Sequence, residues 1–173
     1  MSGIIESVMQ DVGSNGRAAS GLAGFGWIPN TEQKPGEIAR TDDVPPDAMI
    51  CTASDGMNFF APSKANWNAV HDAGQAGGID PMAASAAISH YGNFDFQRDK
   101  SKNIFMSAYT DASNYAVGVY MHGAGFSLPE TKVIGYLYGK AEMSKNAGQP
   151  SQTDWWTRGW NAANAQDLSG VCQ

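Results

Sequence analysis

Apolar residues recur at helical spacing along most of the chain. Helices are predicted at Met1–Val12, at 63–73, from Asp80 to about Tyr91, from Thr110 or Asp111 through Tyr120, at 128–145, and from about Thr153 to Gln166. The helix at 128–145 is the best defined, because Ser127 and Glu130 match a capping box and an apolar stripe follows them. The pattern as a whole predicts a mainly α fold.

Residues 48–60 give the best strand signal in the sequence. Two apolar segments flank Asp55 and Gly56, a pair that supplies the positive φ of a tight hairpin turn. The segment before them, 13–46, is rich in Gly, Ser and Pro, which block long helices. We therefore predict an N-terminal helix and Gly/Pro-rich lead-in over 1–46 and a globular domain over 47–173. The domain is expected to be a compact, bundle-like α+β fold, mainly α, with one small β-hairpin.

The charge balance narrows the partners that the domain can have. The chain carries 11 basic and 17 acidic residues, for a formal net charge of −6. Because that charge repels phosphate backbones, nucleic acid is not an expected partner. No apolar run reaches the roughly 18 to 20 residues of a membrane span, so none is expected. The first residues also lack the basic and apolar regions of a Sec signal peptide.

Cysteine and histidine offer few catalytic or metal-binding patterns. Cys51 and Cys172 allow one disulfide if the protein works outside the cytosol, and two ordinary thiols otherwise. A less favoured alternative makes Cys51 a nucleophile served by His71, His90 or His122. The histidines are isolated, and the zinc and nucleotide-binding motifs are missing from the sequence. We expect neither a metal nor a cofactor.

The segment around Asp95 holds the first candidate for catalysis. Asp95 lies between Phe94 and Phe96, and aromatic neighbours can exclude water from a carboxylate that acts as an acid or base. In the alternative, both rings face the core on a short strand and Asp95 points to water.

Asp111 and Asn114 form a second candidate pair, at the start of a predicted helix. They could assist Asp95, and two carboxylates roughly 5 to 9.5 Å apart would suit glycosidic hydrolysis. In the alternative, Asp111 caps the helix and Asn114 ties it to a loop.

Tryptophans dominate the last predicted helix. Trp155, Trp156 and Trp160 could stack on saccharides, because indole faces bind the C–H faces of sugars. Tryptophans at helical spacing also commonly fill a core, and this alternative stays open.

The order of several short motifs resembles the bacterial toxin 44 domain of polymorphic toxins. The motifs are Gly77-Gly78, Gly92 to Gln97, Ser113 to Gly118, Gly125-Phe126-Ser127 and Asp154 to Gly159. The resemblance covers about Met57 to Gln166, and departs where Gln97 and Ser113 replace a typical lysine and glycine. It implies a secreted weapon against competing bacteria that is countered by a cognate immunity protein.

Together these observations give a leading functional hypothesis and two alternatives. The chain is expected to be a toxin delivered by a secretion-apparatus carrier to the periplasm of target bacteria, where it hydrolyses peptidoglycan. One alternative is a nuclease toxin with a basic groove at Arg98, Lys100, Lys102 and Lys132, and the other is a non-enzymatic adaptor of a secretion system. The expected catalytic residues are Asp95, Asp111 and Asn114, and the expected substrate-binding residues are Phe94, Gln97, Tyr115, Gly118, His122, Trp155 and Trp156.

Overall fold

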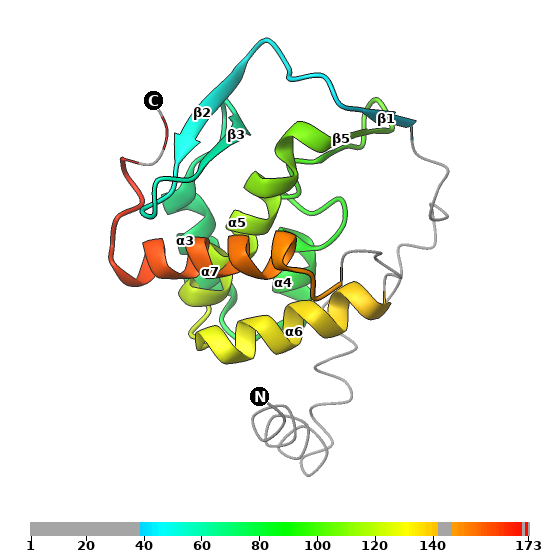
Figure 1. The fold of residues 1–173 in the computed structure, drawn as a ribbon. Coiled ribbons are helices and arrows are strands. Elements are labelled where there is room, and N and C mark those ends of the chain that lie inside the picture. Colours follow the sequence, from blue (N-terminus) through cyan, green and yellow to red (C-terminus); the bar gives the residue numbers. More distant parts are fainter. Residues whose placement is uncertain (1–38, 142–146, 171, 173) are drawn as a thin grey trace.

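The structure is a computed structural model that describes residues 39–141, 147–170 and 172. The helix predicted at Met1–Val12 and most of the lead-in lie outside these ranges. Within them, the fold is mainly helical with a few short strands in two small sheets, which confirms the predicted fold class (Figure 1). No helix in the described part of the chain is long and apolar enough to cross a bilayer.

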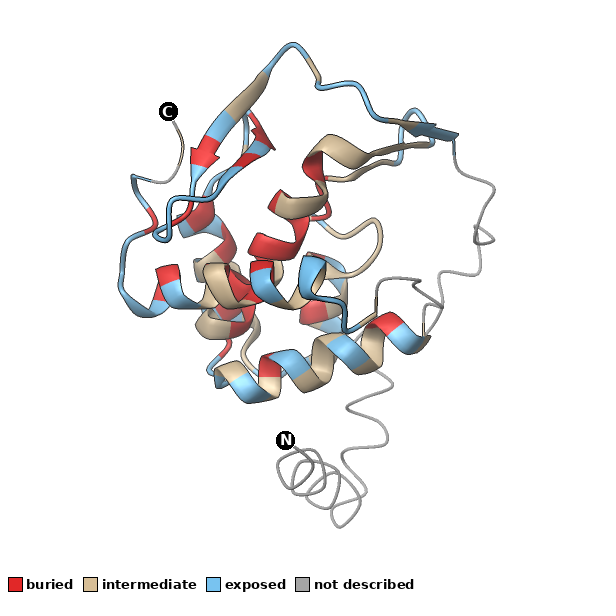
Figure 2. Ribbon diagram, in the orientation of Figure 1, coloured by how far each residue is buried: buried red, intermediate tan, exposed pale blue. Residues whose placement is uncertain are grey.

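Five α-helices make up about half of the described chain. They are α3 (Trp67–Gly77), α4 (Pro81–Ile88), α5 (Thr110–Gly123), α6 (Leu128–Ala141) and α7 (Pro150–Asn164), and a short 3-10 helix, η2 (Ser107–Tyr109), leads into α5. The central helix is α5, which α3 and α7 contact most extensively and which Figure 2 colours largely as buried. Its Tyr115, Val119 and Tyr120 are completely shielded from solvent, so the core of the domain is built around α5.

Two glycines let α5 and α7 pack with their backbones in contact. A Cβ added at Gly118 of α5 would lie 2.0 Å from the carbonyl oxygen of Trp156, and one at Gly159 of α7 would lie 2.0 Å from that of Tyr115. No side chain fits at that separation, so only glycine permits this approach. Gly118, an expected substrate-binding residue, therefore serves helix packing in the structure.

The predicted hairpin is confirmed. Strands β2 (Ala48–Thr52) and β3 (Asn58–Pro62) pair antiparallel, with Cys51 opposite Phe59. The turn between them contains Gly56 at φ 86°, the positive φ expected of the Asp-Gly pair. Phe59 points into the core, where its ring lies 5.1 Å from that of Trp155 and 5.0 Å from that of Tyr115.

A second sheet was not predicted. Strand β5 (Ile104–Met106) pairs in parallel with β1 (Ala39–Thr41) and antiparallel with β4 (Arg98–Asp99). Strands of two or three residues are too short to show an alternating pattern. Strand β1 lies within the stretch interpreted as a lead-in, so that stretch contributes to a sheet of the domain.

Several predicted helix boundaries were wrong, including both ends of the helix predicted at 63–73, since α3 ends at Gly77. Helix α3 begins at Trp67 rather than residue 63, because the Asn66 side chain accepts a hydrogen bond from the N–H of Ala69 and caps the helix there. Helix α4 ends at Ile88 rather than near Tyr91, and α7 begins at Pro150 rather than Thr153. The start of α6 was right: the N–H of Ser127 donates to Glu130 and the N–H of Glu130 to the Ser127 hydroxyl.

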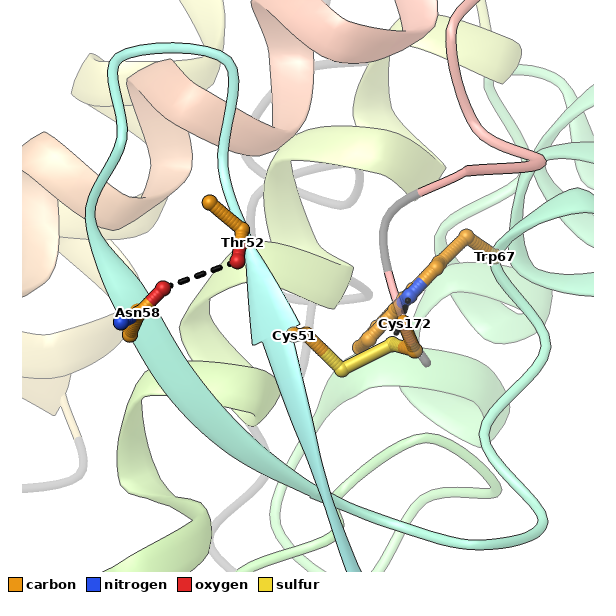
Figure 3. The surroundings of a disulfide bond; sticks show 5 residues. All are labelled: Cys51, Thr52, Asn58, Trp67 and Cys172. Atoms are coloured by element: carbon orange, nitrogen blue, oxygen red, sulfur yellow. Dashed lines mark hydrogen bonds between the residues drawn. A yellow bond between two sulfur atoms is a disulfide. The ribbon is translucent and has the colours of Figure 1, made fainter.

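The two cysteines form a disulfide that joins β2 to the C-terminal tail (Figure 3). Cys51 is completely buried, and the indole N–H of Trp67 donates to Cys172 Sγ at 3.1 Å. This pairing excludes the alternative in which Cys51 is a free nucleophile. The bond fixes Cys172 beside the hairpin and α3.

Candidate functional site

The site is built on the loop that follows α4. The N–H groups of Asn93 and Phe94 donate to the carbonyls of Ala86 and Ala87, so the loop folds back over the last turn of the helix. These bonds satisfy carbonyls that a helix end leaves without partners. A Cβ at Gly92 would lie 2.7 Å from the Ala87 oxygen, so glycine is needed for this fold-back.

Asp95 lies inside this loop and is almost completely shielded from water, with 3% of its side chain exposed. Its Oδ2 accepts a hydrogen bond from the N–H of Tyr91 at 2.8 Å and another from Arg98 Nη1 at 3.0 Å. The alternative with Asp95 pointing to water on a short strand is therefore wrong. Phe96 is buried as that alternative expected, but residues 93–96 form turns rather than a strand.

A pocket of about 80 Å³ opens beside Asp95. Its polar lining comes mainly from the loop and from α5 and α6, and comprises Ser89, His90, Asp95, Gln97, Ser113, Thr131 and Tyr138. Its apolar lining comprises Ala84, Ile88, Val117, Met121, Ile134, Gly135 and Trp156. An apolar pocket with a few converging polar groups is the usual form of a small-ligand site.

Helical periodicity explains how α5 and α6 contribute to the pocket. Ser113, Val117 and Met121 lie four residues apart, so they share one face of α5. The hydroxyl of Ser113 accepts a hydrogen bond from the N–H of Gln97 at 3.0 Å. This contact joins the loop to α5 and places Gln97, an expected substrate-binding residue, at the pocket.

Asn114 lies behind the pocket rather than in it. Its Oδ1 accepts a hydrogen bond from the indole N–H of Trp156 at 3.0 Å, and its Nδ2 donates to the carbonyl of Thr110 at 3.0 Å. The alternative in which it ties the helix to a loop is wrong, because its partners lie on α5 itself and on α7. Asn114 thus orients Trp156, whose ring forms one wall of the pocket.

The structure separates Asp111 from Asp95. Asp111 lies on the first turn of α5 but does not line the pocket, and its side chain does not cap the helix. Burial raises the pKa of Asp111, and the positive charge of Arg158 opposes that shift. The arrangement of two carboxylates for glycosidic hydrolysis is therefore not assembled at this pocket.

Three aromatic candidates serve the core. Trp155 is buried, beneath the guanidinium of Arg158 at 4.4 Å from the ring centre. Tyr115 is completely buried, and burial raises the pKa of its phenol. Phe94 is partly buried and packs against the core, with its ring 6.4 Å from that of Phe96. The core alternative therefore describes Trp155, whereas Trp156 contributes to both core and pocket.

His122 lies in the last turn of α5 and is not among the pocket-lining residues. Its Nδ1 is 3.1 Å from Nε2 of His71 on α3, and its ring packs edge-on against Trp160. Burial, followed by the neighbouring His71, lowers the pKa of His122. Within the described ranges, no three His, Cys, Asp or Glu side chains gather as metal ligands would.

Most of the pocket-lining residues were not among the predicted site residues, and His90 and Tyr138 are two of them. His90 follows Ser89, the C-cap residue of α4, and its N–H donates to the hydroxyl of Tyr138 on α6 at 2.9 Å. The rings of the two residues meet edge-on, with their centres 5.5 Å apart. The polar break at Ser89 and His90 after an Ala-rich helix was the one sequence signal, and it did not identify Tyr138 as the partner.

Comparison with known proteins identifies no relative of this chain. No family model matches the sequence, and neither a curated protein nor a solved structure is significantly similar to it.

Proposed function

We propose that this chain is an antibacterial toxin effector that hydrolyses peptidoglycan in the periplasm of target bacteria. The observation that carries the proposal is the pocket, where Asp95, Gln97 and Trp156 meet. All three were expected in a wall-degrading site from the sequence, and they reach one cavity from the loop and from α7. A polar rim beside an indole wall suits a substrate made of sugars and short peptides.

The disulfide supports an extracytosolic place of action. Structural disulfides form and persist in oxidising compartments such as the periplasm and are rare in the reducing cytosol. The Cys51–Cys172 bond is shielded by burial of Cys51 and joins segments far apart in the chain. In this proposal, a secretion-apparatus carrier delivers the toxin and a cognate immunity protein protects the producer.

The nuclease alternative has less support, because two of its expected basic residues are neutralised by neighbours. Arg98 pairs with Asp95 at 3.0 Å, and Lys102 lies 3.6 Å from Asp99. A phosphate-binding groove needs basic side chains that can release counterions when nucleic acid binds. The net charge of −6 makes such a groove harder to form.

The proposal is tested first by bacterial growth after induction with and without an export signal. We expect lysis only with export, and weaker lysis in Asp95→Asn, which removes the charge but preserves the shape of the side chain. Asp99→Asn is the matched control, because Asp99 is a neighbouring carboxylate outside the pocket lining.

The second test is direct: purified, oxidised protein is incubated with purified sacculi, and soluble fragments are measured. Fragment release without added metal supports the proposal. Intact sacculi, together with toxicity confined to the cytosol and weakened by salt, would instead favour the nuclease. An adaptor would neither release fragments nor affect growth in any compartment.

A further inference from the structure

The contacts of Asp95 suit a residue that holds other groups in place. Both of its oxygens lie within 3.2 Å of Arg98 Nη1, and Oδ2 also accepts the N–H of Tyr91. Arg98 is itself held on its other side, with its guanidinium 5.3 Å from the centre of the Phe105 ring on β5. A carboxylate with its oxygens already engaged is poorly placed to exchange protons with a substrate.

The residue that Asp95 holds has an unusual backbone. Tyr91 adopts φ 63°, a left-handed conformation that is costly for a bulky residue and persists only where its surroundings enforce it. The hydrogen bond from Tyr91 to Asp95 and the fold-back of Asn93 onto α4 provide that enforcement. Together they determine where the preceding residue, His90, lies.

His90 lines the pocket beside Tyr138, with its ring packed edge-on against the Tyr138 ring. Of the three histidines, it is the one among the pocket residues. Imidazole is the side chain best suited to exchange protons near neutral pH. Asp95 is thus connected to His90 through the Tyr91 backbone. Asp95 holds Tyr91 in place, and His90 lines the pocket.

From this arrangement we infer that His90 is the proton-transfer residue of the pocket and that Asp95 is a positioning residue acting through Tyr91. The inference rests on the proposed hydrolase function. His90 accepts a proton from water as the water oxygen bonds to the electrophilic carbon of the substrate. The imidazolium returns that proton to the departing oxygen or nitrogen as its bond to carbon breaks, so one water is added overall.

The test is a double-mutant comparison of the rate of fragment release from sacculi. We expect His90→Gln to lower the rate by about 10² to 10⁴, the usual contribution of general acid–base catalysis. Asp95→Asn should lower it less, since the amide oxygen still accepts the Tyr91 N–H. In the double variant, Asp95→Asn should add almost nothing to the loss caused by His90→Gln, because it acts through that residue.

Chemical rescue distinguishes loss of the imidazole from loss of structure. Added imidazole should restore part of the rate in His90→Gly but not in Asp95→Asn. His71→Gln is the matched control, because His71 is also partly buried but lies on α3 outside the pocket lining. It should keep the wild-type rate, and urea unfolding should show that all variants are folded.

Different results overturn different claims. If wild-type protein releases no fragments, the hydrolase proposal fails and the role of His90 fails with it. If wild-type protein is active and His90→Gln remains within about threefold of it, the inference alone is wrong. If the double variant is much slower than His90→Gln, Asp95 takes part in the chemistry directly and is not a positioning residue.

Discussion

Asn114 uses both ends of its side-chain amide inside the protein. It donates to the carbonyl of Thr110 on its own helix and accepts from Trp156 on α7. The sequence identified Asn114 and Trp156 as candidate site residues. It could not predict the hydrogen bond between them, because 42 positions separate them in the chain. A buried indole N–H needs a partner, and only the packing of α5 against α7 determines which one it finds.

Asp95 also shows that its contacts could not be predicted from the sequence. Its aromatic neighbours indicated a shielded carboxylate, and its side chain is indeed buried. The hydrogen bonds that define its role come from Tyr91 and Arg98, and they depend on a left-handed backbone that an aromatic residue rarely adopts. Residue types therefore indicated that Asp95 is shielded but not which groups it contacts.

His122 makes stability depend on pH near neutrality. Its folded pKa is lowered, chiefly by burial and then by His71, so the unfolded chain binds this proton at a higher pH than the folded chain. The stabilisation is fully present above the unfolded pKa of about 6.5 and is lost as pH falls from there through the lower folded pKa. Urea midpoints between pH 8 and pH 5 should therefore decline toward acid.

His122→Gln should flatten that decline, because glutamine does not titrate. The comparison is between the slopes of the two proteins, so any change in absolute stability that the substitution causes does not affect it. Equal slopes for wild type and variant would show that other groups control the acid sensitivity.

At the scale of elements, the long helices and the hairpin were predictable because each carries several turns or alternations of pattern. The sheet of β1, β5 and β4 was not, since it consists of strands of two or three residues. Its parallel pair joins Ala39 to Ile104, a contact between distant parts of the chain that leaves no local signal. Helix α3 begins later than the apolar pattern predicted, because the capping residue Asn66 determines its first residue.

The contact between α5 and α7 gives a prediction at this scale. Gly118→Ala and Gly159→Ala should each destabilise the protein by roughly 1 to 3 kcal/mol or more, because the new methyl group meets a backbone carbonyl that cannot rotate away. Urea unfolding measures the loss. Since α7 also carries Trp156, both variants should disturb the pocket.

Gly170→Ala is the matched control, because a Cβ there comes no closer than 4.0 Å to another atom. Its urea midpoint should stay close to that of wild type. If Gly118→Ala has no greater effect than Gly170→Ala, the helices are not packed as closely as the structure indicates.

At the scale of the whole molecule, the disulfide connects β2, in the first part of the described fold, to Cys172 in the C-terminal tail. The sequence left its formation open, because nothing local places Cys172 beside Cys51. In the structure, the tail makes an isolated antiparallel bridge with β2 at these two residues. The pairing thus depends on the tail returning from α7 to the hairpin, a tertiary feature.

The disulfide closes a loop with a sequence separation of 121 residues. Linking residues so far apart reduces the entropy of the unfolded chain, for an expected stabilisation of about 5 kcal/mol. Replacing both cysteines by alanine should therefore lower the free energy of unfolding by that order. Dithiothreitol should destabilise wild type to a similar extent and leave the double variant unchanged.

The stability lost without the disulfide also affects how the export experiment is interpreted, because net stabilities of domains are only about 5 to 15 kcal/mol. A toxin kept in the reducing cytosol could be harmless because it is largely unfolded, not because its substrate is absent. The cysteine-free variant separates these two causes when it is assayed on sacculi under conditions in which it is folded. Activity there would show that the disulfide supplies stability alone, whereas inactivity of a folded cysteine-free variant would show that the disulfide also shapes the pocket.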